Sequence, residues 1–221
     1  MDHLSTRDVI AADLTDWRKL AQRLHARYRV ADATAGAALV TDAVAVASAS
    51  ALADHLEVTL GPQLVDLRVG TDLGADGVRL TGDDVTLARA VSDAAARHAA
   101  VAVPEEVTQV EMGLDTADRS RVSRFWAVVL TGTAEAAIGD SVFDPTTRVP
   151  AVWFQETEPH APPRQRWHPD VWVAPEVAEQ RIADAVEAGG TVVDDSQAPS
   201  FTVLADADGN RVCVCTCLDR S

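Results

Sequence analysis

Positive charge is scarce in this chain. Its 221 residues contain 19 Lys and Arg against 34 Asp and Glu, which gives a formal net charge of -15, and Lys19 is the sole lysine. A field of this sign repels nucleic-acid backbones and anionic membrane surfaces, so neither is expected as a partner. Chemistry that needs a Schiff-base or phosphate-loop lysine would depend on Lys19, which the pattern places on a solvated helix.

Long apolar runs and cysteines are also few. The longest bland run, Ala43–Ala53, is too short to span a bilayer, and no amino-terminal segment has the pattern of a secretion signal. The three cysteines, Cys213, Cys215 and Cys217, alternate in VCVCTCL. On a strand this spacing separates the side chains by about 6.5 Å, which is poor geometry for a disulfide. We therefore expect a cytoplasmic protein with reduced thiols and no membrane segment.

Aromatic residues are rare in the first half. Residues 1–100 contain only Trp17 and Tyr28, whereas the remainder holds the other four tryptophans and every phenylalanine. The contrast indicates two separate cores and predicts two domains, residues 1–100 and 104–221, in a chain long enough to bury both. Helical and alternating apolar patterns both occur, so the predicted class is α+β.

The first half has the pattern of helices beside a small sheet. Apolar residues at helical spacing predict one helix from Leu4 to Tyr28 and a second over residues 37–58. Alternation predicts a strand over residues 64–73. Thr81 stands three residues before Asp84, a capping-box pattern at the start of a third helix.

The segment VRLTGDDVTLARAVSDAA, residues 78–95, follows ALADHLEV and resembles the pterin-4a-carbinolamine dehydratase family over residues 1–98. The resemblance implies a small antiparallel sheet flanked by helices, and the tetramer-forming helices of that family imply a homo-oligomer. Asp54, His55 and Leu56 stand where the family has His-His-Pro, and Asp84 is retained. The resemblance thus implies a degenerate site of Asp54, His55 and Asp84. The alternatives are an active 4a-hydroxytetrahydrobiopterin dehydratase and, for His55, a surface position at a helix end.

The second half repeats one pattern of strand, loop and helix followed by short strands, which predicts a paired βαβββ fold. LDTADRSRVSRFW (residues 114–126), RWHPDVWV (residues 166–173) and APSFTVLADADGNRVCVC (residues 198–215) carry a resemblance. They resemble the vicinal oxygen chelate superfamily of glyoxalases, extradiol dioxygenases and bleomycin-resistance proteins, in particular its glyoxalase-like branch, over residues 104–221.

This second resemblance implies a cavity whose metal ligands come from the first and last strands of each copy. Carried over, it gives Glu111, or Gln109 if the register shifts by two, together with Gln155, His168 and Cys213. Glu111, His168 and Cys213 would suit zinc, whereas the amide and the thiol argue against a manganese, iron or magnesium site. The cofactor therefore stays open between a divalent metal and none.

Trp153 has the parity of Gln155, and Trp172 has that of His168, so two indoles are expected to wall the cavity. Packing between domains is the alternative for each tryptophan, and bridging of strands by hydrogen bonds is the alternative for His168. The predicted site consists of catalytic residues and ligand contacts: catalytic His168 and Glu111; ligand-binding Gln155, Trp153, Trp172 and Cys213.

Together these patterns predict a small-molecule-binding glyoxalase-like protein. As an enzyme it would be of lyase, isomerase or dioxygenase type, acting on a small carbonyl-bearing or aromatic compound in the cavity of the second half. The alternative is a non-enzymatic protein that binds and sequesters its ligand.

Overall fold

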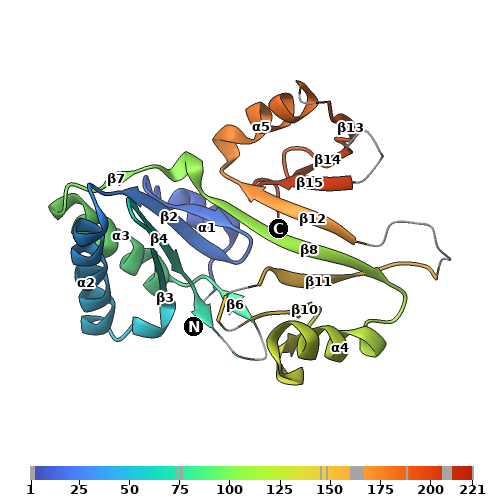
Figure 1. Ribbon diagram of the computed structural model, residues 1–221, viewed down its shortest axis with the longest axis horizontal. Coiled ribbons are helices and arrows are strands. Elements are labelled where there is room, and N and C mark those ends of the chain that lie inside the picture. Colours follow the sequence, from blue (N-terminus) through green and yellow to red (C-terminus); the bar gives the residue numbers. More distant parts are fainter. Residues whose placement is uncertain are drawn as a thin grey trace.

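The computed structural model describes residues 3–72, 74, 77–144, 146–147, 149–159, 167–187, 189–205 and 211–220. Within these residues the chain forms a five-stranded sheet in its first half and an eight-stranded sheet in its second, with helices against both (Figure 1). A two-stranded sheet of β5 and β6 lies outside them. The predicted α+β class is confirmed.

The five-stranded sheet has the order β1-β2-β4-β3, and β7 also pairs with β2. The helices α2 and α3 lie together beside the sheet (Figure 1). The elements of this half are α1 (Thr6–Ala11), β1 (Arg18–Leu20), β2 (Arg23–Arg29), α2 (Ala33–Ala49), the 3-10 helix η1 (Ala53–His55), β3 (Leu56–Leu60), β4 (Leu64–Val69), β5 (Thr71–Asp72), β6 (Val78–Arg79), α3 (Gly82–Arg97) and β7 (Val101–Ala102).

The core of the first half lies between the sheet and these two helices. Leu24, Ala26 and Tyr28 of β2 point inward in alternation and are almost fully buried. They pack in one cluster with residues of the two helices, such as Leu39 and Leu87. The predicted capping box is present at α3, where the side chains of Thr81 and Asp84 bond each other's backbone.

The predicted helix from Leu4 to Tyr28 is wrong. The helix α1 ends at Ala11, Asp13 has a positive φ of 50°, and β1 and β2 then form a hairpin. Leu24, Ala26 and Tyr28 alternate along β2, as buried residues of a strand do. Leu24 and Tyr28 are also four residues apart, a spacing that fits a helix and led to the wrong prediction. Lys19 is therefore on a strand, where its Nζ donates to the carbonyl of Ala21 at 2.6 Å, and burial lowers its pKa.

The predicted helix over residues 37–58 is shifted. Asp32 caps α2 through the backbone N–H groups of Thr34 and Ala35, so the helix begins before residue 37. It ends at Ala49, and Leu56 begins β3.

The second half contains two βαβββ units side by side. The first is β8 (Thr108–Thr116), α4 (Arg119–Thr131), β9 (Ala137–Ile138), β10 (Ser141–Val142) and β11 (Ala151–Glu156); the second is β12 (Trp167–Val173), α5 (Pro175–Glu187), β13 (Thr191–Asp194), β14 (Phe201–Ala205) and β15 (Arg211–Cys215). Two further 3-10 helices are η3 (Pro104–Glu106) and η4 (Ala134–Ala136).

The eight strands have the order β13-β14-β15-β12-β8-β11-β10-β9. The first strands of the two units, β8 and β12, pair antiparallel at the centre, and each pairs in parallel with the last strand of its own unit. The sheet therefore has internal two-fold symmetry, which confirms the predicted paired βαβββ fold. Both helices pack on one face, since Leu114 and Phe154 lie in the cluster beneath α4 and Val173 and Val214 in that beneath α5.

The turn of the β1–β2 hairpin reaches the opposite face of this sheet. Leu20 is fully buried and packs with Ala21 against Trp172 and Cys215. Near it the guanidinium of Arg18 donates two hydrogen bonds, of 2.7 and 2.5 Å, to the carboxylate of Glu176. One hydrophobic cluster therefore spans both halves of the chain. None of the helices in the described ranges is long and apolar enough to cross a bilayer.

Candidate functional site

Five residues of the eight-stranded sheet share the face that α4 and α5 leave free, which we call the polar face: Glu111, Gly113, His168, Asp170 and Cys213. Asp170 stands opposite Glu111 and His168 opposite Gly113 where β12 pairs with β8, and Asp170 stands beside Cys213 where β12 pairs with β15. Because side chains alternate between the faces of a strand, all five lie on the same side.

Asp170 is the centre of a polar cluster on this face. Its carboxylate lies 3.5 Å from His168 Nε2 and accepts a 2.8 Å hydrogen bond from Trp153 Nε1. The Cys213 sulfur lies within 4.8 Å of a carboxylate oxygen of Asp170. The Trp153 ring meets the His168 ring edge to face, with centroids 5.6 Å apart. Ligand atoms of His168, Asp170 and Cys213 all lie within 4.8 Å of one another.

Gly113 makes room for the imidazole of this cluster. A Cβ atom at position 113 would lie 2.4 Å from His168 Cε1 and 2.5 Å from its Nε2, closer than non-bonded carbon atoms approach. Any larger residue at position 113 would displace the imidazole ring from this position. The glycine is therefore part of the site, although it contributes no functional group.

Burial sets the protonation of the cluster. It raises the pKa of the Asp170 carboxyl, against the lowering effects of His168 and of the hydrogen bonds from Trp153 and Cys213. Burial and the neighbouring carboxylate of Asp170 raise the pKa of Cys213 to about 12. The thiol therefore keeps its proton at neutral pH and needs a bound cation to become a thiolate.

In the described part of the chain, Glu111 is not among the residues whose ligand atoms lie together around Asp170. One carboxylate oxygen of Glu111 accepts from Trp172 Nε1 at 2.9 Å and the other from Gln22 Nε2 at 3.3 Å. Burial raises the pKa of this carboxyl. The predicted metal set combined His168 and Cys213 with Glu111, whereas the ligand atoms that lie together are those of His168, Asp170 and Cys213.

The other predicted contacts have different surroundings. Trp172 is buried in the cluster shared with the β1–β2 hairpin, in agreement with the packing alternative. Gln155 is exposed near the end of β11. Gln109 shares the parity of Glu111 and lines a cavity between the two halves. Of the two indoles, Trp153 alone contacts the cluster around Asp170.

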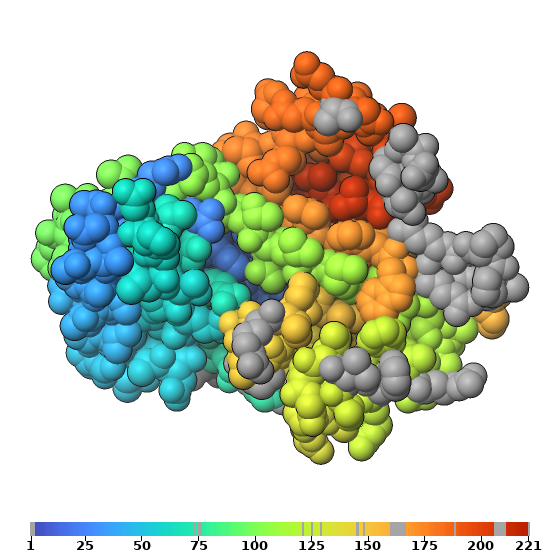
Figure 2. All heavy atoms as spheres, viewed as in Figure 1, coloured from blue at the N-terminus to red at the C-terminus, as the bar shows by residue number. Residues whose placement is uncertain are grey.

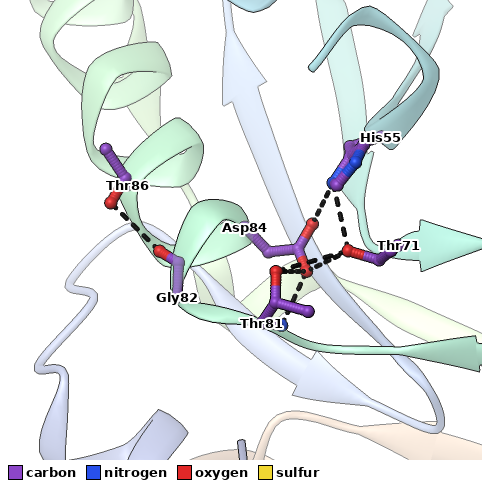
Figure 3. Close-up of polar contacts among 6 residues, drawn as sticks. All are labelled: His55, Thr71, Thr81, Gly82, Asp84 and Thr86. Carbon is purple, nitrogen blue, oxygen red and sulfur yellow. Dashed lines mark hydrogen bonds and ion pairs between the residues drawn. The ribbon is translucent and has the colours of Figure 1, made fainter. Parts of the chain in front are cut away.

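Asp84 and His55 of the predicted degenerate site do lie together in the first half (Figure 3). Asp84 is fully buried, and one carboxylate oxygen lies 2.8 Å from His55 Nδ1. The other oxygen accepts from Thr71 Oγ1 at 2.8 Å and from the backbone N–H of Thr81 at 2.7 Å. Asp54 is exposed and lines the cavity between the halves instead.

Comparison with known proteins identifies the second half. Residues 111–215 match the family model of the glyoxalase-like domain. The match confirms the glyoxalase-like resemblance and supports small-molecule binding by this part of the chain. No curated protein matches the chain. A solved structure with local similarity is that of a transcriptional coactivator/pterin dehydratase from Brucella melitensis, with 20% sequence identity, a TM-score of 0.37, and coverage of 42% of this chain and 99% of that one.

The polar cluster of the glyoxalase-like domain has the chemistry of a zinc site. An imidazole nitrogen, a carboxylate oxygen and a thiolate sulfur are the three donor types that zinc accepts, and three protein ligands leave a position for water or substrate. The room left by Gly113 lets His168 approach the other two donors. His168, Asp170 and Cys213 would hold the ion.

Two functional residues were missed by the sequence-based prediction. Asp170 has the same parity as His168 and Trp172 in WHPDVW, and this signal was sufficient to place it on the polar face. Gln22 belongs to the first half, 89 residues before Glu111, and no local pattern connects the two.

Proposed function

We propose that the glyoxalase-like domain binds a small organic molecule at the polar cluster of His168, Asp170, Cys213 and Trp153. The observation that supports the proposal is the convergence of three ligand atoms, all within 4.8 Å of one another, on the polar face. A carboxylate buried this deeply is costly unless groups of complementary charge or donors meet it. The position of Asp170 beside an imidazole favours a binding or proton-transfer role.

The preferred ligand carries a carbonyl or similar oxygen. Trp153 offers a flat apolar surface, and in the metal-free site His168 offers a nitrogen that can donate a hydrogen bond or transfer a proton. Asp170 orients that imidazole through the 3.5 Å contact with Nε2. When bound to the three ligands, a zinc ion would polarise the oxygen of the small molecule.

Metal analysis of the protein, purified without chelator or affinity metal, tests the ligand set. We expect about one zinc per chain, lost in Cys213→Ser and retained in Cys217→Ser, because Cys217 lies outside the group of three ligands. Metal-free wild-type protein that takes up no added zinc, or equal zinc in both variants, would contradict the proposed ligands.

Turnover decides between an enzyme of lyase, isomerase or dioxygenase type and a binding protein. For an enzyme, His168→Ala should abolish turnover of a small carbonyl compound while changing its Kd by less than about tenfold. The second candidate, a non-enzymatic binder, is favoured by Glu111, since both of its oxygens are held internally. It predicts measurable affinity without turnover in the wild type.

A third candidate, 4a-hydroxytetrahydrobiopterin dehydratase activity in the first half, rests on the pair of His55 and Asp84 alone. An assay of wild type and His55→Ala with that substrate decides it. No difference between the two proteins would reject it.

A further inference from the structure

A cavity of about 670 Å³ lies between the two halves of the chain. Figure 2 shows the surface hollowed between the blue and cyan first half and the green and yellow part of the second half. Its volume is in the range of small-molecule sites. It is separate from the cluster of His168, Asp170 and Cys213, none of which lines it.

The wall from the first half carries an Arg-Glu-Arg group on the face of the five-stranded sheet that points away from its helices. Arg23 Nη2 lies 3.1 Å from one carboxylate oxygen of Glu57, and Arg68 Nη2 lies 3.0 Å from the other. All three side chains are only 20–26% exposed. Two guanidinium groups share one carboxylate, so this group of three side chains carries a net charge of +1.

The surroundings of His25 show the sign of the electrostatic potential at this wall. His25 stands opposite Arg68 where β2 pairs with β4, and it also lines the cavity. Burial, followed by the positive charges of Arg68 and Arg23, lowers its pKa to about 3. The imidazole is therefore neutral and leaves the positive charge of the two arginines in place.

Acidic residues line the cavity as well, but they are engaged or solvated. Asp54, Asp72 and Glu135 are exposed, where water and salt screen their charges. Asp144 accepts from the backbone N–H of Thr146 at 2.8 Å and so supports its own loop. The Arg-Glu-Arg group, in contrast, is largely shielded from solvent.

The wall from the second half is mostly apolar. It includes Ala136, Ile138, Phe143 and Val149, which lie in or beside β9, β10 and the segment before β11. Arg68 joins the two walls, since its Nη2 donates a 2.9 Å hydrogen bond to Thr147 Oγ1. An apolar surface thus faces a positive one across the cavity.

We propose that this cavity is a second binding site, which takes a small organic monocarboxylate with an apolar body. The carboxylate binds the free guanidinium donors of Arg23 and Arg68 and neutralises the net charge of the Arg-Glu-Arg group. The apolar body lies against the wall that contains Ile138 and Phe143. Guanidinium groups suit this role because their planar donors match the geometry of a carboxylate.

The test compares benzoate with benzamide, its neutral counterpart, by isothermal titration calorimetry on the full chain. We expect benzoate to bind at least about tenfold more tightly, as a charge-assisted hydrogen bond allows. Glu57→Gln should tighten benzoate binding several-fold and leave benzamide unchanged, because it removes the competing carboxylate. Arg23→Met should remove the preference for benzoate.

Arg29→Gln is the matched control. It removes the same charge from an arginine that is 57% exposed, paired with Glu106 and absent from the cavity lining, so it should leave the preference intact. Circular dichroism reports whether each variant folds, and Glu57→Gln decides the matter if Arg23→Met does not. Equal affinity for benzoate and benzamide in the wild type, or a Glu57→Gln variant with no gain, would overturn the proposal.

Discussion

Substitution of Gly113 by alanine separates the geometry of the polar cluster from the stability of the fold. The added Cβ would lie 2.4 Å from His168 Cε1, whereas carbon atoms in contact are about 3.5–4.0 Å apart. The imidazole must therefore move by about 1 Å or more. That movement breaks its 3.5 Å contact with Asp170 and its edge-to-face contact with Trp153.

The cost to folding should be small, because the clashing atoms are at the end of a side chain that can turn. Overpacking costs about 1–3 kcal/mol, and we expect a loss of about 1 kcal/mol in the free energy of unfolding. The site should lose far more, since displacing one of the three proposed ligands is expected to lower zinc affinity by about 10- to 100-fold. Zinc titration and urea denaturation measure the two effects.

Gly82→Ala is the matched control for this prediction. A Cβ at position 82 meets no atom within 4 Å, so both the zinc affinity and the free energy of unfolding should stay close to those of the wild type. Gly113→Ala protein with the zinc affinity of the wild type would refute the assigned position of His168.

Three further predictions concern buried polar groups. Trp172→Phe leaves one oxygen of buried Glu111 without its donor and should cost about 1–3 kcal/mol in urea denaturation; an unchanged midpoint would contradict the bond. Asp84→Asn should cost about 3 kcal/mol, because Asp84 is fully buried and accepts several hydrogen bonds, while Asp83→Asn in the same first turn should cost less than about 0.5 kcal/mol. His25 has a pKa of about 3 in the folded chain against 6.5 ordinarily, so the unfolded state alone takes up its proton between these values. Stability should then fall below pH 6.5 by up to about 1.4 kcal/mol per pH unit, and a His25→Gln variant with the same slope would disprove this.

Strand parity allowed much of the polar face to be predicted from the sequence. Glu111, His168 and Cys213 were placed on facing strands, and their parity is that of the structure. Parity does not give the register between strands that are distant in the chain. The pairing of Asp170 with Cys213 depends on where β15 stops along β12, and this contact decides which carboxylate joins the cluster.

The first half shows a different limit. Leu20, Leu24 and Tyr28 recur every four residues and also alternate with polar residues, so both helical and strand patterns fit. The hairpin turn between Leu20 and Arg23 resolves the ambiguity by burying Leu20 against Trp172, more than 150 residues away. Such a contact leaves no local trace, so the sequence leaves Trp172 open between a cavity wall and packing between domains.

The burial of Leu20 and Ala21 beneath the second sheet also constrains how the chain can vary. A cut near residue 100 would separate two recognisable patterns and yet leave Trp172 and Cys215 without their apolar neighbours. A fragment made of the second half alone would therefore expose an apolar surface through which copies of the fragment aggregate. In related proteins, a substitution in the hairpin turn should be accompanied by a compensating substitution in β12. The two halves should also occur together in the same chain.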